Sequence, residues 1–86
     1  MNSEQERTRK EIIDHVEQLR AQINEYKEFG GISESKKILK SSIDDLVFTI
    51  GYRYKKNKIS LKEFKPFFVT AKTLSNEINL LKIEGQ

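Results

Sequence analysis

This 86-residue chain contains no cysteine, no tryptophan and only one proline. Without cysteine it cannot form a disulfide, a thiolate metal site or a cysteine nucleophile, and this suits a reducing compartment. No apolar run approaches the roughly 18 residues that suggest a membrane-spanning helix. The first ten residues are polar, so we expect no secretory signal. These absences favour a cytoplasmic protein and leave a peripheral position at the membrane open.

Catalytic and ligand-binding motifs are also missing. The sequence has no P-loop, no glycine-rich dinucleotide turn, no HExxH and no set of zinc ligands. The single histidine, His15, lies beside a predicted apolar stripe, and we interpret it as a surface residue. Asp44 and Asp45 are adjacent, so on a helix they point about 100° apart and cannot form a carboxylate pair. We therefore predict a non-enzymatic protein with no catalytic residue, cofactor or metal.

The composition is polar for a globular protein, with 36% hydrophobic and 34% charged residues. Long amphipathic helices fit this balance, because each needs only one apolar stripe. The length predicts a single domain over residues 1–86. A net charge of +3 permits an anionic partner, such as nucleic acid or a membrane surface, without requiring one.

A first helix is predicted at about residues 3–29. Ser3 and Glu6 have the spacing of a capping box at its start, and the Gly30-Gly31 pair ends it. Ile13 widens its apolar stripe. The stripe alternates steps of four and three through Ile12, Val16, Leu19, Ile23 and Tyr26.

A second helix is predicted at about residues 33–56, with Ser33 or Ser35 as its cap. Val47 and Tyr54 widen its stripe, and Gly51 marks a possible close approach of two backbones. The stripe itself consists of Leu39, Ile43, Leu46 and Ile50.

An alternative remains for residues 47–61. Phe48, Ile50, Tyr52 and Tyr54 alternate as in a strand, and a turn at 56–57 would return the chain as a β-hairpin. The four-three spacing favours a helix, because it continues unbroken into Ile50.

A third helix is predicted to end near residue 83 and to begin either at residue 60 or at residue 66. Ser60 and Glu63 form a second capping-box pattern, whereas Pro66 suits the first position of a helix. Phe68 and Val69 flank its stripe, which consists of Phe67, Ala71, Leu74, Ile78 and Leu81. Three stripes with short connections predict an all-α fold, a single small antiparallel bundle of three long helices.

A cluster of cations and aromatic rings surrounds the second connection and is the predicted partner-binding site. It comprises Tyr52, Arg53, Tyr54, Lys55, Lys56, Lys58, Lys62, Phe64 and Lys65. Such a cluster can bind phosphates or acidic groups. The cluster can also be a solvated helix end with its rings in the core. This second interpretation is favoured over nucleic-acid binding, because no DNA-binding module pattern accompanies the cluster. Lys36, Lys37 and Lys40 extend the cluster if they share its side.

Two stretches resemble the immunity proteins that protect producers of pediocin-like bacteriocins. Residues Glu11 to Arg20 are similar to the opening helix of that family, and Lys55 to Glu63 resemble its loop and following capped helix start. The resemblance implies a small, non-enzymatic, cytoplasmic antiparallel four-helix bundle. It also implies recognition of the bacteriocin-engaged sugar-transporter receptor at the membrane, with specificity largely in the C-terminal half.

A second resemblance is to the two-helix sporulation phosphatases that act on a phosphorylated response regulator, and it lies in Leu19-Arg20, Gly31-Ile32-Ser33 and Ser41 to Asp45. Ser41 to Asp45 correspond to their Ser-Gln-Glu-Leu-Asp motif and keep its two ends. We expect a helical bundle that acts by binding another protein, with bacteriocin immunity as its specific form. A response-regulator antagonist and a small phage or plasmid DNA-binding regulator are the alternatives.

Overall fold

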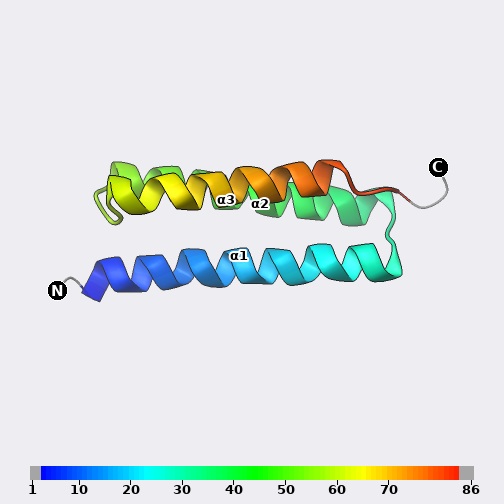
Figure 1. The fold of residues 1–86 in the computed structure, drawn as a ribbon, viewed down its shortest axis with the longest axis horizontal. Helices are drawn as coiled ribbons and strands as arrows, with labels where there is room; N and C mark the ends of the chain where they lie inside the picture. Colours follow the sequence, from blue (N-terminus) through cyan, green and yellow to red (C-terminus); the bar gives the residue numbers. More distant parts are fainter. Residues whose placement is uncertain (1–2, 84–86) are drawn as a thin grey trace.

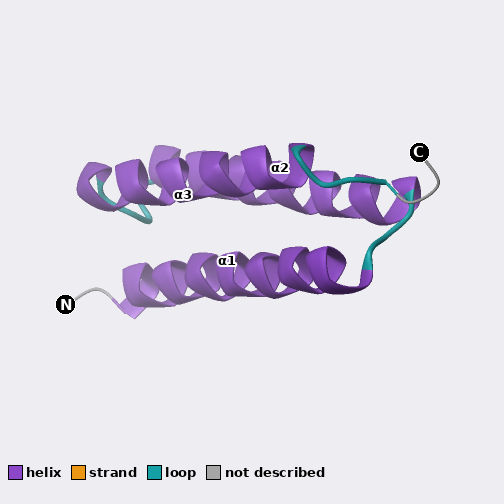
Figure 2. Cartoon of the chain, turned by 45° about the vertical axis from the view of Figure 1, so that its right-hand side comes forward, coloured by secondary structure: helices purple, strands orange, loops and turns teal. Residues whose placement is uncertain are grey.

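The computed structural model describes residues 3–83, which form three helices and no strand. α1 spans Ser3–Phe29, α2 spans Ser33–Lys55 and α3 spans Leu61–Asn79. Consecutive helices run antiparallel in a bundle measuring 50 × 17 × 17 Å (Figure 1). The predicted all-α antiparallel bundle is confirmed. The β-hairpin alternative is wrong, because residues 47–55 continue α2 (Figure 2).

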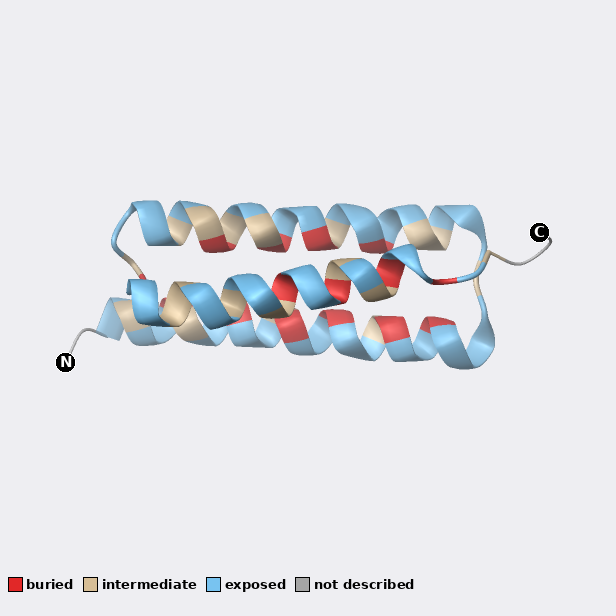
Figure 3. Cartoon of the chain, turned by 45° about the horizontal axis from the view of Figure 1, so that its top comes forward, coloured by how far each residue is buried: buried red, intermediate tan, exposed pale blue. Residues whose placement is uncertain are grey.

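The core contains one buried side of each helix, and exposed residues cover the outward sides (Figure 3). Every member of the three predicted stripes is buried, except Phe67, which is half-buried against the core. Ile13, predicted to widen the first stripe, is instead 40% exposed. Two buried residues were missed by the stripes: Thr8, whose hydroxyl donates to the Glu4 carbonyl (2.9 Å), and Ile59.

Two glycines and a tyrosine end α1. Gly30 has a φ of 77°, which favours glycine, and its N–H donates to the Tyr26 carbonyl (2.7 Å). The Tyr26 hydroxyl shares its single proton between the carbonyls of Gly31 (3.0 Å) and Lys82 (2.8 Å). This side chain therefore ties the first connection to the segment after α3. At the other end, Ser3 is the first described residue, so its predicted cap borders residues outside the described range and stays a prediction.

The start of α2 differs from the prediction. Its cap position is Ile32, with no side-chain hydrogen bond, so the predicted serine cap at Ser33 or Ser35 is wrong. Gly51 does not mark a close backbone approach, because a Cβ at this position would meet nothing within 4 Å. α2 ends at Lys55, and the connection turns through Asn57, which has a φ of 61°.

α3 opens at its capping residue. The Ser60 hydroxyl accepts a hydrogen bond from the Glu63 N–H (3.3 Å), so the predicted start at residue 60 is confirmed and the start at Pro66 is wrong. The helix ends at Asn79 and does not continue to residue 83. Lys36 Nζ donates to the carbonyls of Asn79 (3.0 Å) and Leu81 (2.8 Å). These carbonyls are satisfied without a further helical turn, because α2 supplies the donor.

Candidate functional site

The predicted partner-binding residues all lie where α2 turns into α3, but they divide among four surfaces, the last of which holds Lys62 and Lys65. The first surface faces α1. Arg53 pairs with Glu11 (3.5 Å between Nη2 and Oε2), and Lys58 pairs with Glu4 (2.5 Å between Nζ and Oε1). The hydrogen bond from Lys58 lowers the pKa of Glu4, and the Lys58 charge adds to the effect. These two cations therefore hold α1 in place and are not free for a partner.

The second surface is the outward side of α2. Tyr52 stacks on Phe48, with ring centroids 6.0 Å apart, and Lys56 Nζ lies 5.7 Å from the Tyr52 centroid. Lys55 is exposed beside them. Phe48 was missed as a surface residue by sequence reasoning, although it is 72% exposed. Its spacing of four from Tyr52, outside the buried stripe, is the signal that could have found it.

The third surface follows the contact between α2 and α3. The rings of Tyr54 and Phe64 stack with centroids 4.5 Å apart, and Phe64 and Phe68 follow at 5.6 Å. Lys72 Nζ lies 5.7 Å from the Phe68 centroid. A continuous row of aromatic groups ending in a lysine thus runs along α3. The predicted Tyr54 and Phe64 belong to this row, and Phe68 and Lys72 extend it.

Both acidic side chains of α3 turn toward α1. Glu63 bonds to Arg9, and Glu77 pairs with Lys27 (3.8 Å between Nζ and Oε1). The hydrogen bond from Arg9 lowers the pKa of Glu63, and contacts with Ser60 lower it further against the opposing effect of burial. The outward side of α3 is left with no carboxylate of its own, since these are the two acidic residues of the helix.

We call this outward side the α3 face. Positions 61, 65, 68 and 72 are spaced by four, three and four, so they share one side of the helix, and positions 62 and 69 flank it. Leu61 is 51% and Val69 63% exposed. No ion pair within residues 3–83 involves the three lysines of this surface. The α3 face consists of Leu61, Lys62, Lys65, Phe68, Val69 and Lys72.

The lysines at the start of α2 do not extend this surface. Lys36 lies beside the end of α3, where it binds the carbonyls of Asn79 and Leu81. Lys37 and Lys40 occupy the same end of a molecule that is 50 Å long. The first two turns of α2 are therefore far from the second connection.

Polar groups elsewhere in the described chain include one contact between α1 and α2. The Nε2 atom of His15 lies 3.1 Å from the Ser42 hydroxyl, so this half-buried histidine joins α1 to α2 and is not the surface residue that we predicted. Among residues 3–83, no group of three or more histidine, aspartate or glutamate side chains could hold a metal ion. Ile43, at the centre of the 41–45 segment, is 2% exposed. The sporulation-phosphatase alternative stays a prediction.

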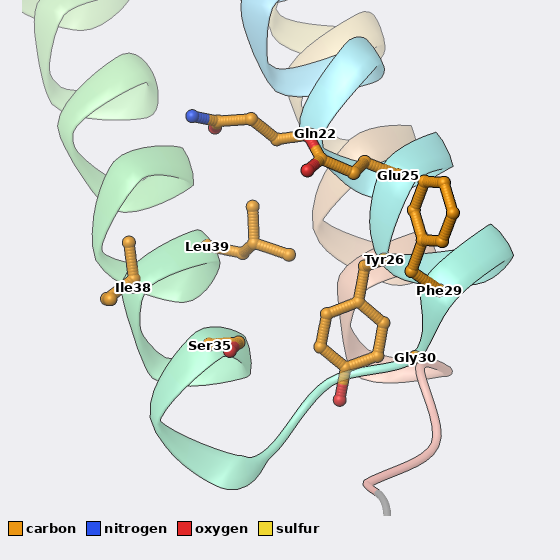
Figure 4. A pocket seen from close by; sticks show the side chains of 8 residues that line it. All are labelled: Gln22, Glu25, Tyr26, Phe29, Gly30, Ser35, Ile38 and Leu39. Atoms are coloured by element: carbon orange, nitrogen blue, oxygen red, sulfur yellow. The ribbon is translucent and has the colours of Figure 1, made fainter.

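A pocket of about 260 Å³ opens between α1 and α2 at the opposite end of the bundle (Figure 4). Phe29 and Ile38 border it, and both are largely exposed. The nearby Tyr26 hydroxyl is already bonded to two carbonyls. The pocket is smaller than the roughly 300–1,000 Å³ typical of small-molecule sites, so it is the weaker candidate.

Within the part of the chain that the structure describes, no helix combines the length and apolar character needed to cross a bilayer. Comparison of the chain with protein-family models, with curated proteins and with solved structures finds no match.

Proposed function

We propose that this protein is a non-enzymatic binding protein that recognises an acidic, partly apolar segment of another protein through the α3 face. One observation carries the proposal. Glu63 and Glu77 are both drawn to α1 by ion pairs, which leaves the α3 face with three lysines and no compensating carboxylate. The Coulomb attraction of such a surface speeds encounter with acidic partners and orients them.

The apolar groups on the α3 face complement its charges. Phe68 and Val69 lie between the lysines. Phe64 stacks on Phe68, and Tyr54 stacks on Phe64. Aromatic side chains in such positions commonly anchor protein interfaces. From residue 62 to residue 72 the helix rises by roughly 15 Å, at about 1.5 Å per residue. An amphipathic acidic helix of about ten residues would match this length and chemistry.

Charge reversal with a matched control tests the proposal. The first variant combines Lys62→Glu, Lys65→Glu and Lys72→Glu. The control combines Lys10→Glu, Arg20→Glu and Lys40→Glu, three exposed residues that lie away from the α3 face. Both variants change the net charge equally, so a difference in binding between them shows that the position of the changed charges matters. Circular dichroism verifies that each variant stays folded.

The probe is a fluorescent amphipathic peptide of glutamate and leucine residues, and the readout is its anisotropy. Wild type and the control variant should bind it. The α3 variant should bind at least about tenfold more weakly, because each lost charge pair contributes about 0.5 kcal/mol or more. Binding of the peptide should weaken as salt rises. Equal binding by all three proteins would refute the proposal.

Nucleic acid is the other outcome of this test. Random-sequence duplex DNA is titrated in parallel at two salt concentrations. A DNA-binding protein would lose affinity linearly in a log–log plot against salt, with a slope near the number of neutralised phosphates. Strong DNA binding with that slope, together with no binding of the acidic peptide, would replace the protein-binding function by a nucleic-acid one.

Bacteriocin immunity is the specific form that we propose for this binding, in the cytoplasm at the inner surface of the membrane. It is supported by the resemblance of the 11–20 and 55–63 stretches and by the position of the α3 face in the C-terminal half. The described residues have three helices where that family has four. The test is expression in a bacteriocin-sensitive strain followed by a pediocin-like bacteriocin. Wild type should protect the cells and the α3 variant should not. Absence of protection by wild type removes the immunity role and leaves the binding proposal standing.

A further inference from the structure

From residue 44 to its C-terminal end, the outward side of α2 carries a sequence of charges that is complementary to its own reverse. In this segment Asp44 and Asp45 come first, the exposed aromatic pair Phe48 and Tyr52 follows, and Lys55 with the capping residue Lys56 comes last. The exposed Lys37 and Lys40 lie one to two turns earlier, outside this segment. Positions 44, 48, 51 and 55 are spaced by four, three and four, so they form one stripe. This stripe lies opposite the buried one, which contains Leu46 and Ile50.

Two charges lie on this stripe, Asp44 and Lys55, and two more, Asp45 and Lys56, lie about 100° around the helix from them. All four are exposed and take part in no ion pair within the described residues, and Lys56 Nζ lies 5.7 Å from the centroid of the Tyr52 ring. Phe48 is 72% exposed and Tyr52 46%. An exposed aromatic pair flanked by unpaired opposite charges is typical of an interface centre with a polar rim.

Gly51 leaves the surface of α2 without a side chain beside Phe48. A Cβ at this position would meet nothing within 4 Å, so the helix surface is open there. Gly51 lies three residues from Phe48, on the same side of α2. A large side chain that approaches from outside therefore finds space next to the Phe48 ring.

We propose that the protein forms a symmetric dimer in which α2 packs antiparallel against α2 of a second copy. In this register Phe48 of each copy lies over Gly51 of the other, and Asp44 faces Lys55 of the other copy. The two-fold axis repeats each contact, as an isologous interface requires. A parallel arrangement would set Asp44 against Asp44 and Lys55 against Lys55, so like charges oppose it.

The occupant is a second copy because the stripe supplies both halves of the contact. In the antiparallel arrangement the acid–aromatic–base order of one copy runs against the base–aromatic–acid order of the other. Asp44 of each copy therefore meets Lys55 of the other. The α3 face belongs to a different helix, so the dimer leaves it free for the partner proposed above. The two proposals can therefore fail independently.

Molar mass in solution tests the dimer. Light scattering after gel filtration, at increasing protein concentration, should show wild type approaching twice the chain mass of 10.1 kDa. Asp44→Lys with Asp45→Lys should give a monomer, and so should Lys55→Asp with Lys56→Asp, because each places like charges across the interface. An equimolar mixture of the two variants should restore the dimer, since the opposite charges then face one another again.

Two further variants complete the test. Phe48→Ser should be monomeric and remain helical by circular dichroism, because this side chain lies outside the core. Lys62→Glu with Lys65→Glu and Lys72→Glu should remain dimeric. A wild type that stays monomeric at every concentration, or a mixture of the two charge variants that stays monomeric, would overturn the proposal. Dimers that persist in both charge variants would place the interface elsewhere and also overturn it.

Discussion

A single methyl group added at Gly31 tests how Tyr26 ties the first connection to the segment after α3. A Cβ at this position would lie 2.2 Å from Cε2 and 2.6 Å from Cδ2 of Tyr26. The Tyr26 side chain is only 7% exposed, and the single proton of its hydroxyl is shared between the carbonyls of Gly31 (3.0 Å) and Lys82 (2.8 Å). The ring cannot move away without breaking this shared hydrogen bond.

The expected cost of Gly31→Ala follows from that shared hydrogen bond. Displacing the ring leaves the buried hydroxyl without its acceptors, which should lower the free energy of unfolding by about 1–3 kcal/mol. Domains of this kind are stabilised by only about 5–15 kcal/mol in total. The melting temperature should fall by about 4–8 °C for each kcal/mol lost.

Urea denaturation followed by circular dichroism measures the effect in two backgrounds. In wild type Gly31→Ala should cost about 1–3 kcal/mol. In a Tyr26→Leu background the methyl group meets no ring, so the same change should cost less than about 0.5 kcal/mol. Equal costs in both backgrounds would show that the backbone, and not the ring, opposes the methyl group. A cost below about 0.5 kcal/mol in wild type would show that Tyr26 is not held in the described position.

Three other predictions concern the core, the ion pairs and the end of α3. Leu46→Ala should cost about 2–5 kcal/mol in urea denaturation, because the side chain is fully buried, and a loss below about 1 kcal/mol would contradict the described core. The depressed pKa values of Glu4 and Glu63 stabilise the fold above their ordinary value of 4.5, and this stability should be lost as the pH falls below 4.5. Glu63→Gln should therefore show a flatter pH profile of melting temperature, and an unchanged profile would show that its ion pair is not formed. Lys36→Met should speed amide exchange in the last turn of α3, because it removes the donor to the Asn79 carbonyl. Unchanged exchange would mean that this bond does not stabilise the last turn of α3.

The helical core could be predicted because its signal is local. Spacings of four and three identify the buried side of a helix without knowledge of its neighbours. Leu19 and Leu46 were found in this way, and both are fully buried. The end of α3 could not be found by the same rule. Leu81 continues the stripe and is buried, yet it lies beyond the helix, since Lys36 and Tyr26 supply donors from other elements.

The candidate site was predictable only as a location. The sequence places its cations and rings near the second connection, but it cannot indicate which cations α1 neutralises. The pairing of Arg53 with Glu11 joins residues that are brought together only by the packing of helices. The same packing turns Glu63 toward Arg9, and the α3 face is therefore left without a carboxylate. Phe48 was missed because it lies outside every buried stripe.

Site-specific photo-crosslinking in cells of the native host most directly tests whether the α3 face binds a protein. Benzoylphenylalanine replaces Val69, which is 63% exposed on the α3 face, or Phe29, which is 72% exposed at the opposite end of the bundle. We expect one discrete protein crosslink from position 69, none of the same mass from position 29, and loss of the product when the three lysines of the α3 face are changed to glutamate. A crosslink of equal yield from both positions, or one from position 69 that survives the charge reversal, would contradict recognition of an acidic partner through the α3 face.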